Sequence, residues 1–271
     1  MARPHLDNVA VQVESDAIAI LELNRPVALN ALNTPLLKDL LAALQWAENE
    51  AAIRVVVLSG KGRTLTVGLD LLDKSVRGEE GVMVSDEFVD ALSSVQENLI
   101  TSNKIVISAV KGPAPGWATS SLALSDLVYA TSDAYFFTPF VRWGLCAEAC
   151  SSQTLMWTMG RQRASALILA GAKMTAHDLK LSGLVTEIFD NERFMDSVLD
   201  VARSILRLPS DALTKNKKLM MAGGTREMLL ETSRREMIEF RRLARGKECR
   251  EAVAAFSVSQ SHKKQGRRSR L

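Results

Sequence analysis

Apolar, β-branched runs that end in glycine-containing loops alternate with helical segments along about the first two hundred residues. Residues 54–59 form one such run, followed by Gly60, and residues 105–110 form another, followed by Gly112. Shorter runs at 127–130 and 184–189 repeat the pattern, each after a helical segment. Continuous apolar runs of this length are typical of strands that are buried on both faces. The alternation therefore predicts an α/β fold.

The two ends of the chain differ from its middle. Residues 9–13 and 17–23 are strand-like runs on either side of a short turn, and residues 36–47 have helical spacing after the start signal Asn33-Thr34-Pro35. After Pro209 there is no strand-like run up to residue 256, and the apolar residues follow helical spacing. We therefore expect a core over 1–208, a helical region over 209–256 that packs on the core or on another subunit, and a basic flexible tail over 257–271.

Composition and charge limit the classes of function. The net charge is +3 and the basic excess lies in the C-terminal tail, so we expect no nucleic-acid partner. No stretch is long and apolar enough for a membrane span, and residues 1–7 lack the apolar segment of a secretory signal. Three cysteines make no disulfide framework, and three dispersed histidines have no metal-ligand spacing. We expect an intracellular, reducing environment and no metal site.

The sequence closes with Ser269-Arg270-Leu271, a close variant of the Ser-Lys-Leu tripeptide that is read as a peroxisomal address. Arg270 keeps the positive charge of the middle position. The preceding residues are polar and basic, as an accessible tail requires. We expect Ser269, Arg270 and Leu271 to bind the peroxisomal import receptor, which predicts a peroxisomal location. The alternative is a chance tripeptide on a solvated tail.

Glu148 is the only charged residue between Arg142 and Arg161, in a run of apolar and small residues that predicts a helix. A carboxylate that enters an apolar helix loses hydration, and this raises its pKa towards the range in which it can take and return a proton. Glu148 is therefore a candidate general base. The alternative is a solvated glutamate in a first helical turn, where the helix dipole favours it.

Two glycine turns follow buried strands. The strand at 54–59 leads to Gly68 and the strand at 105–110 leads to Gly116, each just before a predicted helix. Glycine lets the backbone approach a ligand closely, and two free N–H groups that converge on one oxygen make an oxyanion hole. The alternative for each turn is tight strand-to-helix geometry, and the alternative for Asp70 is helix capping.

Five motifs follow one another along nearly the whole chain, namely Leu23-Asn-Arg-Pro-Val-Ala-Leu-Asn-Ala-Leu32, Gly62-Arg-Thr-Leu-Thr-Val-Gly-Leu-Asp-Leu71, Lys111-Gly-Pro-Ala-Pro-Gly116, Ser125-Asp-Leu-Val-Tyr-Ala130 and Gly183-Leu-Val185. Together these motifs resemble the crotonase (enoyl-CoA hydratase/isomerase) superfamily. The resemblance implies a crotonase-like spiral of ββα units with a C-terminal helical region used in trimer assembly, as a homotrimer or hexamer. It also implies an acyl-CoA substrate and no separate cofactor, because coenzyme A is part of the substrate.

The same resemblance assigns the two glycine turns to the substrate. It implies that the backbone N–H groups of Leu69 and Trp117 hold the thioester oxygen. It further implies that the residues of both turns bind the substrate, namely Val67, Gly68, Leu69, Asp70, Leu71, Gly116 and Trp117.

Departures from the family pattern indicate which reaction within the superfamily the chain catalyses, hydration or isomerisation. Hydratases of this family carry two glutamates, at positions that are Ser120 and Phe140 in this chain. Adding water across a double bond needs an acid and a base, so a hydratase is disfavoured. Residues 138–152 instead resemble the peroxisomal Δ3,Δ2-enoyl-CoA isomerases, in which a glutamate at the position of Glu148 is the catalytic base.

We therefore expect a Δ3-Δ2-enoyl-CoA isomerase that converts 3-enoyl-CoA to 2-trans-enoyl-CoA in fatty-acid β-oxidation, with Glu148 moving a proton from C2 to C4 through a dienolate. Two alternatives stay open. Another crotonase-type chemistry on an acyl-CoA, such as dienoyl-CoA isomerisation or a secondary-metabolite step, would use the same oxyanion hole. A catalytically silent acyl-CoA binder is favoured if Glu148 is solvent-exposed and more than about 6 Å from a ligand-sized cavity.

Overall fold

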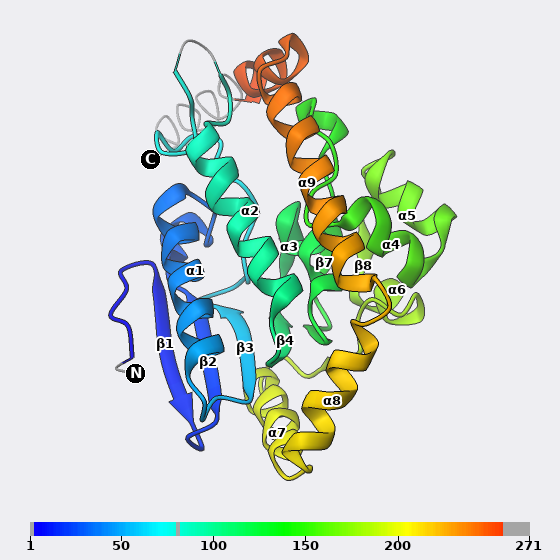
Figure 1. Cartoon of the computed structure of the whole chain (residues 1–271). Coiled ribbons are helices and arrows are strands. Elements are labelled where there is room, and N and C mark those ends of the chain that lie inside the picture. The colour runs from blue at the N-terminus through cyan, green and yellow to red at the C-terminus, as the bar shows by residue number, and fades with distance from the viewer. Residues whose placement is uncertain (1–2, 80–81, 257–271) are drawn as a thin grey trace.

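A six-stranded sheet forms the centre of the computed structural model, which describes residues 3–79 and 82–256 (Figure 1). The first two strands pair antiparallel across a short turn, and the other neighbouring pairs are parallel. The predicted α/β fold is confirmed. In spatial order the strands are β1 (Val9–Glu14), β2 (Ile18–Leu23), β3 (Val55–Gly60), β4 (Ile105–Val110), β6 (Leu127–Thr131) and β9 (Glu187–Phe189).

Helices cover both faces of this sheet. In β3, Val56 and Leu58 face one core, to which α1 (Thr34–Asn49) and α2 (Asp86–Thr101) contribute. Val55 and Val57 face a second core, to which α7 (Phe194–Leu206) contributes. Successive side chains of a strand point to opposite faces, so a strand covered on both sides is apolar throughout. This explains the continuous apolar runs in the sequence.

A smaller three-stranded sheet carries the second glycine turn. β5 (Pro113–Pro115) pairs parallel with β7 (Tyr135–Phe137), which pairs antiparallel with β8 (Met174–Thr175). The Gly116 N–H donates to the Phe137 carbonyl at 2.9 Å, so the turn after β5 is tied to the end of β7. Short helical elements complete this part of the fold: η1 (Pro26–Ala28), α3 (Trp117–Ser120), η2 (Ser121–Leu124), η3 (Val141–Trp143), α4 (Ser151–Met159), α5 (Arg161–Ile168) and α6 (Ala176–Leu181).

The described chain after residue 209 is helical, as predicted. It consists of α8 (Ser210–Met220), α9 (Thr225–Ala244) and a helix over 247–256. α9 runs alongside α2 (Figure 1), where the buried Ser233 hydroxyl lies 3.1 Å from the side-chain oxygen of Gln96. Lys217 of α8 forms an ion pair with Asp126, with Nζ and Oδ2 2.7 Å apart. The C-terminal helices thus pack on the core of their own chain.

Local signals predicted some element boundaries well and others poorly. The Asn33 side chain caps α1 as predicted, accepting from the Leu36 N–H at 3.1 Å. The strand predicted over 184–189 is shorter, because the N–H groups of Leu184 and Val185 bond to the Leu179 carbonyl at the end of α6. The helix predicted directly after Gly68 is wrong, since the described residues 69–79 form turns and α2 begins only at Asp86.

Candidate active site

The two glycine turns meet at one point of the structure. Gly68 and Gly116 have left-handed φ angles of +78° and +58°. A Cβ atom on Gly68 would lie 3.1 Å from the Pro115 carbonyl oxygen and 3.8 Å from the Gly116 Cα, so the two turns lie next to each other. The left-handed φ favours glycine at both positions, and the close approach to Pro115 favours it further at Gly68.

The N–H groups of Leu69 and Trp117 are free donors beside these glycines. Leu32 bonds to both neighbours of Leu69: its N–H donates to the Gly68 carbonyl at 2.8 Å, and its carbonyl accepts from the Asp70 N–H at 2.9 Å. Trp117 is the first residue of α3, where an N–H has no intrahelical partner. Within the described chain, neither N–H takes part in a hydrogen bond. Two free donors on adjacent turns can hold one oxyanion.

A cavity of about 430 Å³ opens beside the glycine turns. Six of the seven residues predicted to bind substrate line it. The exception is Trp117, whose indole is buried in the core near Leu58 and Ser121. The size and the mainly apolar wall suit a ligand with a hydrocarbon part. The lining residues are Ala31, Val67, Gly68, Leu69, Asp70, Leu71, Leu72, Pro115, Gly116, Phe137, Pro139, Phe140, Arg142, Trp143, Leu145, Glu148, Phe240 and Phe256.

Sequence reasoning missed the part of this wall that comes from late in the chain. Phe240 lies on α9 and Phe256 lies in the helix over 247–256. Trp143 packs edge-on against Phe256, with ring centroids 5.0 Å apart. The helical spacing around Phe240 indicated an apolar face, but spacing alone does not say which part of the core that face covers.

Glu148 lies in the cavity wall, on a turn that precedes α4. Its side chain is 1% exposed, and among the described residues its Oε2 has no hydrogen-bond partner. The prediction that Glu148 enters a helix is wrong. Ala149 and Cys150 adopt left-handed φ angles of +55° and +60°, so α4 begins only at Ser151. The alternative of a solvated glutamate in a first helical turn is wrong for the same reasons.

Burial and, secondly, the negative charge of Glu236 raise the pKa of Glu148 to about 8. The Ser120 hydroxyl acts in the opposite direction. A carboxyl group whose pKa lies near neutral can both take and return a proton within one reaction. Glu148 therefore has the acid–base property that its apolar sequence environment predicted.

We expect Glu148→Gln to stabilise the fold at alkaline pH. Unfolded wild-type chain loses the Glu148 proton near pH 4.5, whereas the folded chain keeps it to about pH 8. The contribution of Glu148 to the free energy of unfolding therefore falls as the pH rises through this window, by about 5 kcal/mol in total. Urea unfolding at about pH 5, 7 and 9 should show that the variant's advantage over the wild type grows with pH. A constant difference would mean that Glu148 titrates as it does in the unfolded chain.

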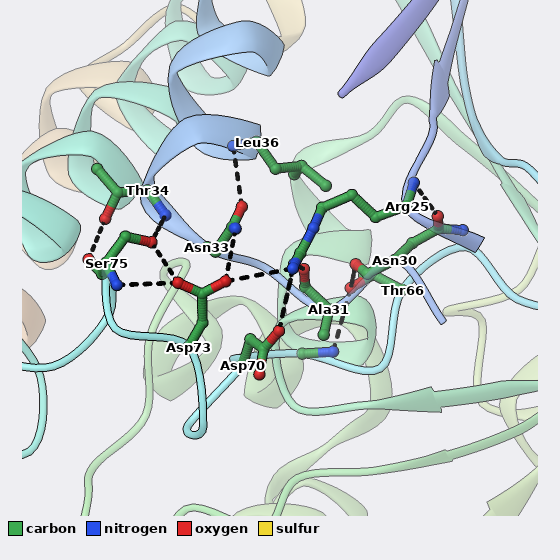
Figure 2. Close-up of polar contacts among 11 residues, drawn as sticks. Arg25, Asn30, Ala31, Asn33, Thr34, Leu36, Thr66, Asp70, Asp73 and Ser75 are labelled. Carbon is green, nitrogen blue, oxygen red and sulfur yellow. Dashed lines mark hydrogen bonds and ion pairs between the residues drawn. The ribbon is translucent and has the colours of Figure 1, made fainter. Parts of the chain in front are cut away.

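Arg25 from the N-terminal motif holds the first glycine turn in place (Figure 2). Its guanidinium pairs with Asp70 Oδ2 at 3.3 Å and with Asp73 Oδ2 at 3.2 Å, and it donates to the Ala31 carbonyl. The Asn33 amide donates to the same Asp73 oxygen at 2.8 Å. Asp70 is thus an ion-pair partner, and the alternative that it caps a helix is wrong, because turns follow it in the described chain.

Arg25→Ala is expected to lower the free energy of unfolding by about 2 kcal/mol, because it leaves two mostly buried carboxylates unpaired and close together. Urea unfolding measures this loss. Lys38→Ala is the matched control, since it breaks a pair with Glu87 whose side chains are 60% and 65% exposed and should change stability by less than about 0.5 kcal/mol. Equal stability of the two variants would contradict the assigned role of Arg25.

The two positions at which hydratases carry glutamates lie beside Glu148 and in the cavity wall. Ser120 is fully buried on α3 next to Glu148, and Phe140 lines the cavity with 5% exposure. Among the described lining residues the carboxyl groups are those of Glu148 and Asp70, and Asp70 is paired with Arg25. Glu148 is therefore the one unpaired carboxyl group in the described wall.

Other sequence predictions concern metal, membrane and targeting. In residues 3–79 and 82–256, no three His, Cys, Asp or Glu side chains are grouped so that they could hold a metal ion. The same part of the chain has no helix with the length and apolar character needed to cross a bilayer. The tail over 257–271, with Ser269, Arg270 and Leu271, lies outside the described residues.

The sequence is similar to enzymes that act on enoyl-CoA. A family model described as enoyl-CoA hydratase/isomerase matches residues 13–264. Enoyl-CoA delta isomerase 2 of Rattus norvegicus is 31% identical over 246 residues, which cover 88% of this chain and 61% of the rat protein. Peroxisomal enoyl-CoA delta isomerase 3 of Mus musculus is 30% identical over 208 residues, which cover 76% of this chain and 64% of the mouse protein. The chain thus spans less than two thirds of the length of either relative.

The fold is similar to solved structures of the same kind. The crystal structure of an enoyl-CoA hydratase/isomerase from Pseudoalteromonas atlantica matches with a TM-score of 0.84 and 29% sequence identity. The match covers 93% of this chain and 98% of that one. The predicted crotonase-like fold with C-terminal helices is confirmed.

Proposed function

The chain belongs to the enoyl-CoA hydratase/isomerase family, and we propose that it shifts the double bond of 3-enoyl-CoA thioesters to give 2-trans-enoyl-CoA. One observation carries the proposal: the buried, unpaired carboxyl group of Glu148 shares a cavity with the two adjacent glycine turns. Moving a proton along a thioester needs one base and donors for the developing oxyanion. The name of the rat relative supports the same reaction class.

The proposed reaction starts with the thioester oxygen between the N–H groups of Leu69 and Trp117. The Glu148 carboxylate removes a proton from C2, and the electron pair moves onto the thioester oxygen to form a dienolate. Each N–H donor stabilises that charge by about 3 kcal/mol. Glu148 then returns the proton to C4, so that the double bond lies between C2 and C3. No atom is added or lost, and one carboxyl group is enough.

The cavity wall supports isomerisation over hydration. A hydratase must also activate a water molecule and deliver it to the substrate. At the two positions where relatives carry acids for this purpose, the chain has Ser120 and Phe140, neither of which is an acid. The aromatic and aliphatic side chains around Glu148 limit the access of water to the dienolate.

The test supplies the purified protein with a 3-enoyl-CoA and follows the conjugated 2-enoyl product by its absorbance. A parallel reaction supplies 2-trans-enoyl-CoA, and mass spectrometry reports whether it gains water. Isomerisation without hydration is the expected result. Hydration without isomerisation would overturn the proposal, and faster turnover of a 3,5-dienoyl-CoA would favour dienoyl-CoA isomerisation instead.

A catalytically silent acyl-CoA binder is the alternative from a different class. A Glu148 side chain that faces solvent, away from any ligand-sized cavity, would favour that alternative. The 1% exposure of Glu148 and its place in the cavity wall support the enzyme instead. Acyl-CoA binding without turnover of any enoyl-CoA would favour the silent binder.

We also propose that the protein acts in peroxisomal β-oxidation as a homotrimer or hexamer. The Ser269-Arg270-Leu271 sequence and the peroxisomal mouse relative support the location. A fluorescent fusion with and without these residues tests whether they bind the import receptor and direct the protein to peroxisomes.

Sedimentation of the purified protein tests the proposed assembly. Exposed apolar side chains on α8 and α9 support it, namely Leu219, Met220, Met228 and Ile238. The substrate brings its own coenzyme A, so the proposal includes no separate cofactor.

A further inference from the structure

A second buried carboxyl group, Glu236 on α9, contacts the turn that carries Glu148. Its Oε2 accepts a hydrogen bond from the Cys150 N–H at 2.7 Å, and its Oε1 accepts one from the Ser152 N–H at 2.9 Å. Glu236 is 7% exposed. The contact joins segments that lie 86 and 84 residues apart in the sequence.

The turn needs this contact for two reasons. Ala149 and Cys150 both have left-handed φ angles, which are unfavourable for residues with a Cβ atom. The first N–H groups of α4 have no intrahelical partner, and within the described chain the Cys150 side chain does not cap them. A carboxylate at a helix start supplies charge-assisted hydrogen bonds and complements the helix dipole. Glu236 thus stabilises the backbone conformation that immediately follows Glu148.

Glu236 lies outside the substrate cavity. It borders a separate hollow of about 320 Å³, together with Cys146, Ser152 and Arg235, and is not among the described residues that line the cavity of Glu148. Glu236 is therefore not itself a contact of a substrate in that cavity, and it acts on the cavity only through the turn of Glu148.

The charge of Glu236 also acts on Glu148. It is the second cause, after burial, of the raised pKa of Glu148. Burial raises the pKa of Glu236 itself, and its N–H donors and Arg235 act in the opposite direction. Burial raises the pKa values of the nearby thiols to about 12, which keeps them neutral. Within residues 3–79 and 82–256, the titratable groups around Glu236 besides Glu148 and Arg235 are Cys146, Cys150 and Glu239.

We infer that Glu236 is a positioning residue for Glu148: it fixes the turn that presents the base, and its negative charge favours the protonated form of Glu148. This inference rests on the proposed function, in which Glu148 carries the proton from C2 to C4. During the reaction, Glu148 holds the C2 proton between these two transfers. A nearby negative charge helps Glu148 keep the proton until C4 accepts it.

The test compares Glu236→Gln with Glu239→Gln, which removes the same charge from an exposed position of the same helix. The dependence of kcat/KM on pH is measured with a 3-enoyl-CoA. In Glu236→Gln we expect the midpoint of the acid limb to fall by roughly one pH unit, because the repulsion is gone. The rate on the plateau of the profile should fall by about tenfold, because the N–H of Cys150 or of Ser152 loses its acceptor and the turn holds Glu148 less well in place. KM should be nearly unchanged. Glu239→Gln should match the wild type.

The inference would be overturned if the acid limb of the kcat/KM profile of Glu236→Gln had the same midpoint as that of the wild type, at any plateau rate. A purely structural role for Glu236 would lower the rate without moving this midpoint. Glu236→Asp keeps the negative charge, but its shorter side chain moves the carboxylate away from the N–H groups of Cys150 and Ser152. This variant should therefore keep the midpoint of the acid limb and lower the plateau value of the rate. If Glu236→Gln does not fold, a wild-type plateau in Glu236→Asp overturns the inference.

A readout without turnover separates this inference from the proposed function. Infrared difference spectra of the wild type and Glu148→Gln isolate the carbonyl stretch of protonated Glu148. If the wild type does not isomerise 3-enoyl-CoA, the proposed function fails. The pH at which this band loses half of its intensity is then compared between Glu236→Gln and the wild type. A lower value in Glu236→Gln supports the action of Glu236 on Glu148, and an equal value overturns it.

Discussion

A Glu148→Gln enzyme is expected to bind acyl-CoA normally and to lose about 10³-fold in kcat for double-bond isomerisation. Glutamine keeps the shape of the side chain but neither takes nor returns a proton. The proposed oxyanion donors, the N–H groups of Leu69 and Trp117, and the apolar wall are kept in this variant, so the affinity for the substrate should stay within about twofold. Steady-state kinetics with 3-enoyl-CoA and calorimetric titration with an acyl-CoA measure the two quantities.

The control for this experiment is Glu231→Gln. Glu231 lies on α9, and its side chain is 57% exposed. Removing its charge should leave kcat and acyl-CoA affinity at the wild-type level. If Glu148→Gln keeps a kcat within about tenfold of the wild type, Glu148 is not the base.

Gly116→Ala is expected to lower kcat by roughly 10²-fold to 10³-fold, because it disturbs one oxyanion donor. Gly116 has φ +58° and ψ −123°, a conformation that a residue with a Cβ atom adopts only under strain. Relief of that strain rotates the peptide and turns the N–H of Trp117 away from the Leu69 N–H. The methyl group itself has room, since its nearest neighbours would be Pro139 Cδ at 3.9 Å and Gly68 Cα at 4.0 Å. The loss would therefore come from the backbone and not from a blocked cavity.

Gly223→Ala is the matched control for Gly116→Ala. Gly223 also has a left-handed φ, +67°, and lies between α8 and α9 with no described atom within 4 Å of an added Cβ. Its substitution should lower the melting temperature slightly and leave kcat unchanged. If both variants lose kcat equally, the effect of Gly116→Ala is general destabilisation.

The parts of the fold that depend on local physics could be predicted from the sequence. β4 occupies residues 105–110 as predicted, because a strand buried on both faces must be apolar throughout. α1 begins where Asn33 and Pro35 indicate, because capping acts within one helical turn. The start of β9 could not be predicted, because the apolar residues Leu184 and Val185 bond back to the Leu179 carbonyl of α6 before the strand begins at Glu187.

The candidate site was predictable only in part. The burial of Glu148 followed from its apolar neighbours, and the glycine turns followed from strand ends and the family resemblance. The backbone at Ala149 and Cys150 did not follow, because Glu236 stabilises it from a distant helix. The aromatic side chains of Phe240 and Phe256 were missed for the same reason, since long-range packing sets which face of a helix covers which cavity.

The place of α9 in the sequence has a consequence for biosynthesis. The ribosome makes the chain from its N-terminus, and the sheet strands through β9 are translated before α9 begins at Thr225. A nascent polypeptide can therefore form both glycine turns before Glu236 and Phe240 leave the exit tunnel. A chain truncated before Thr225 would carry Glu148 without the side chain that stabilises its turn, so we expect the proposed isomerisation only once α9 has been translated.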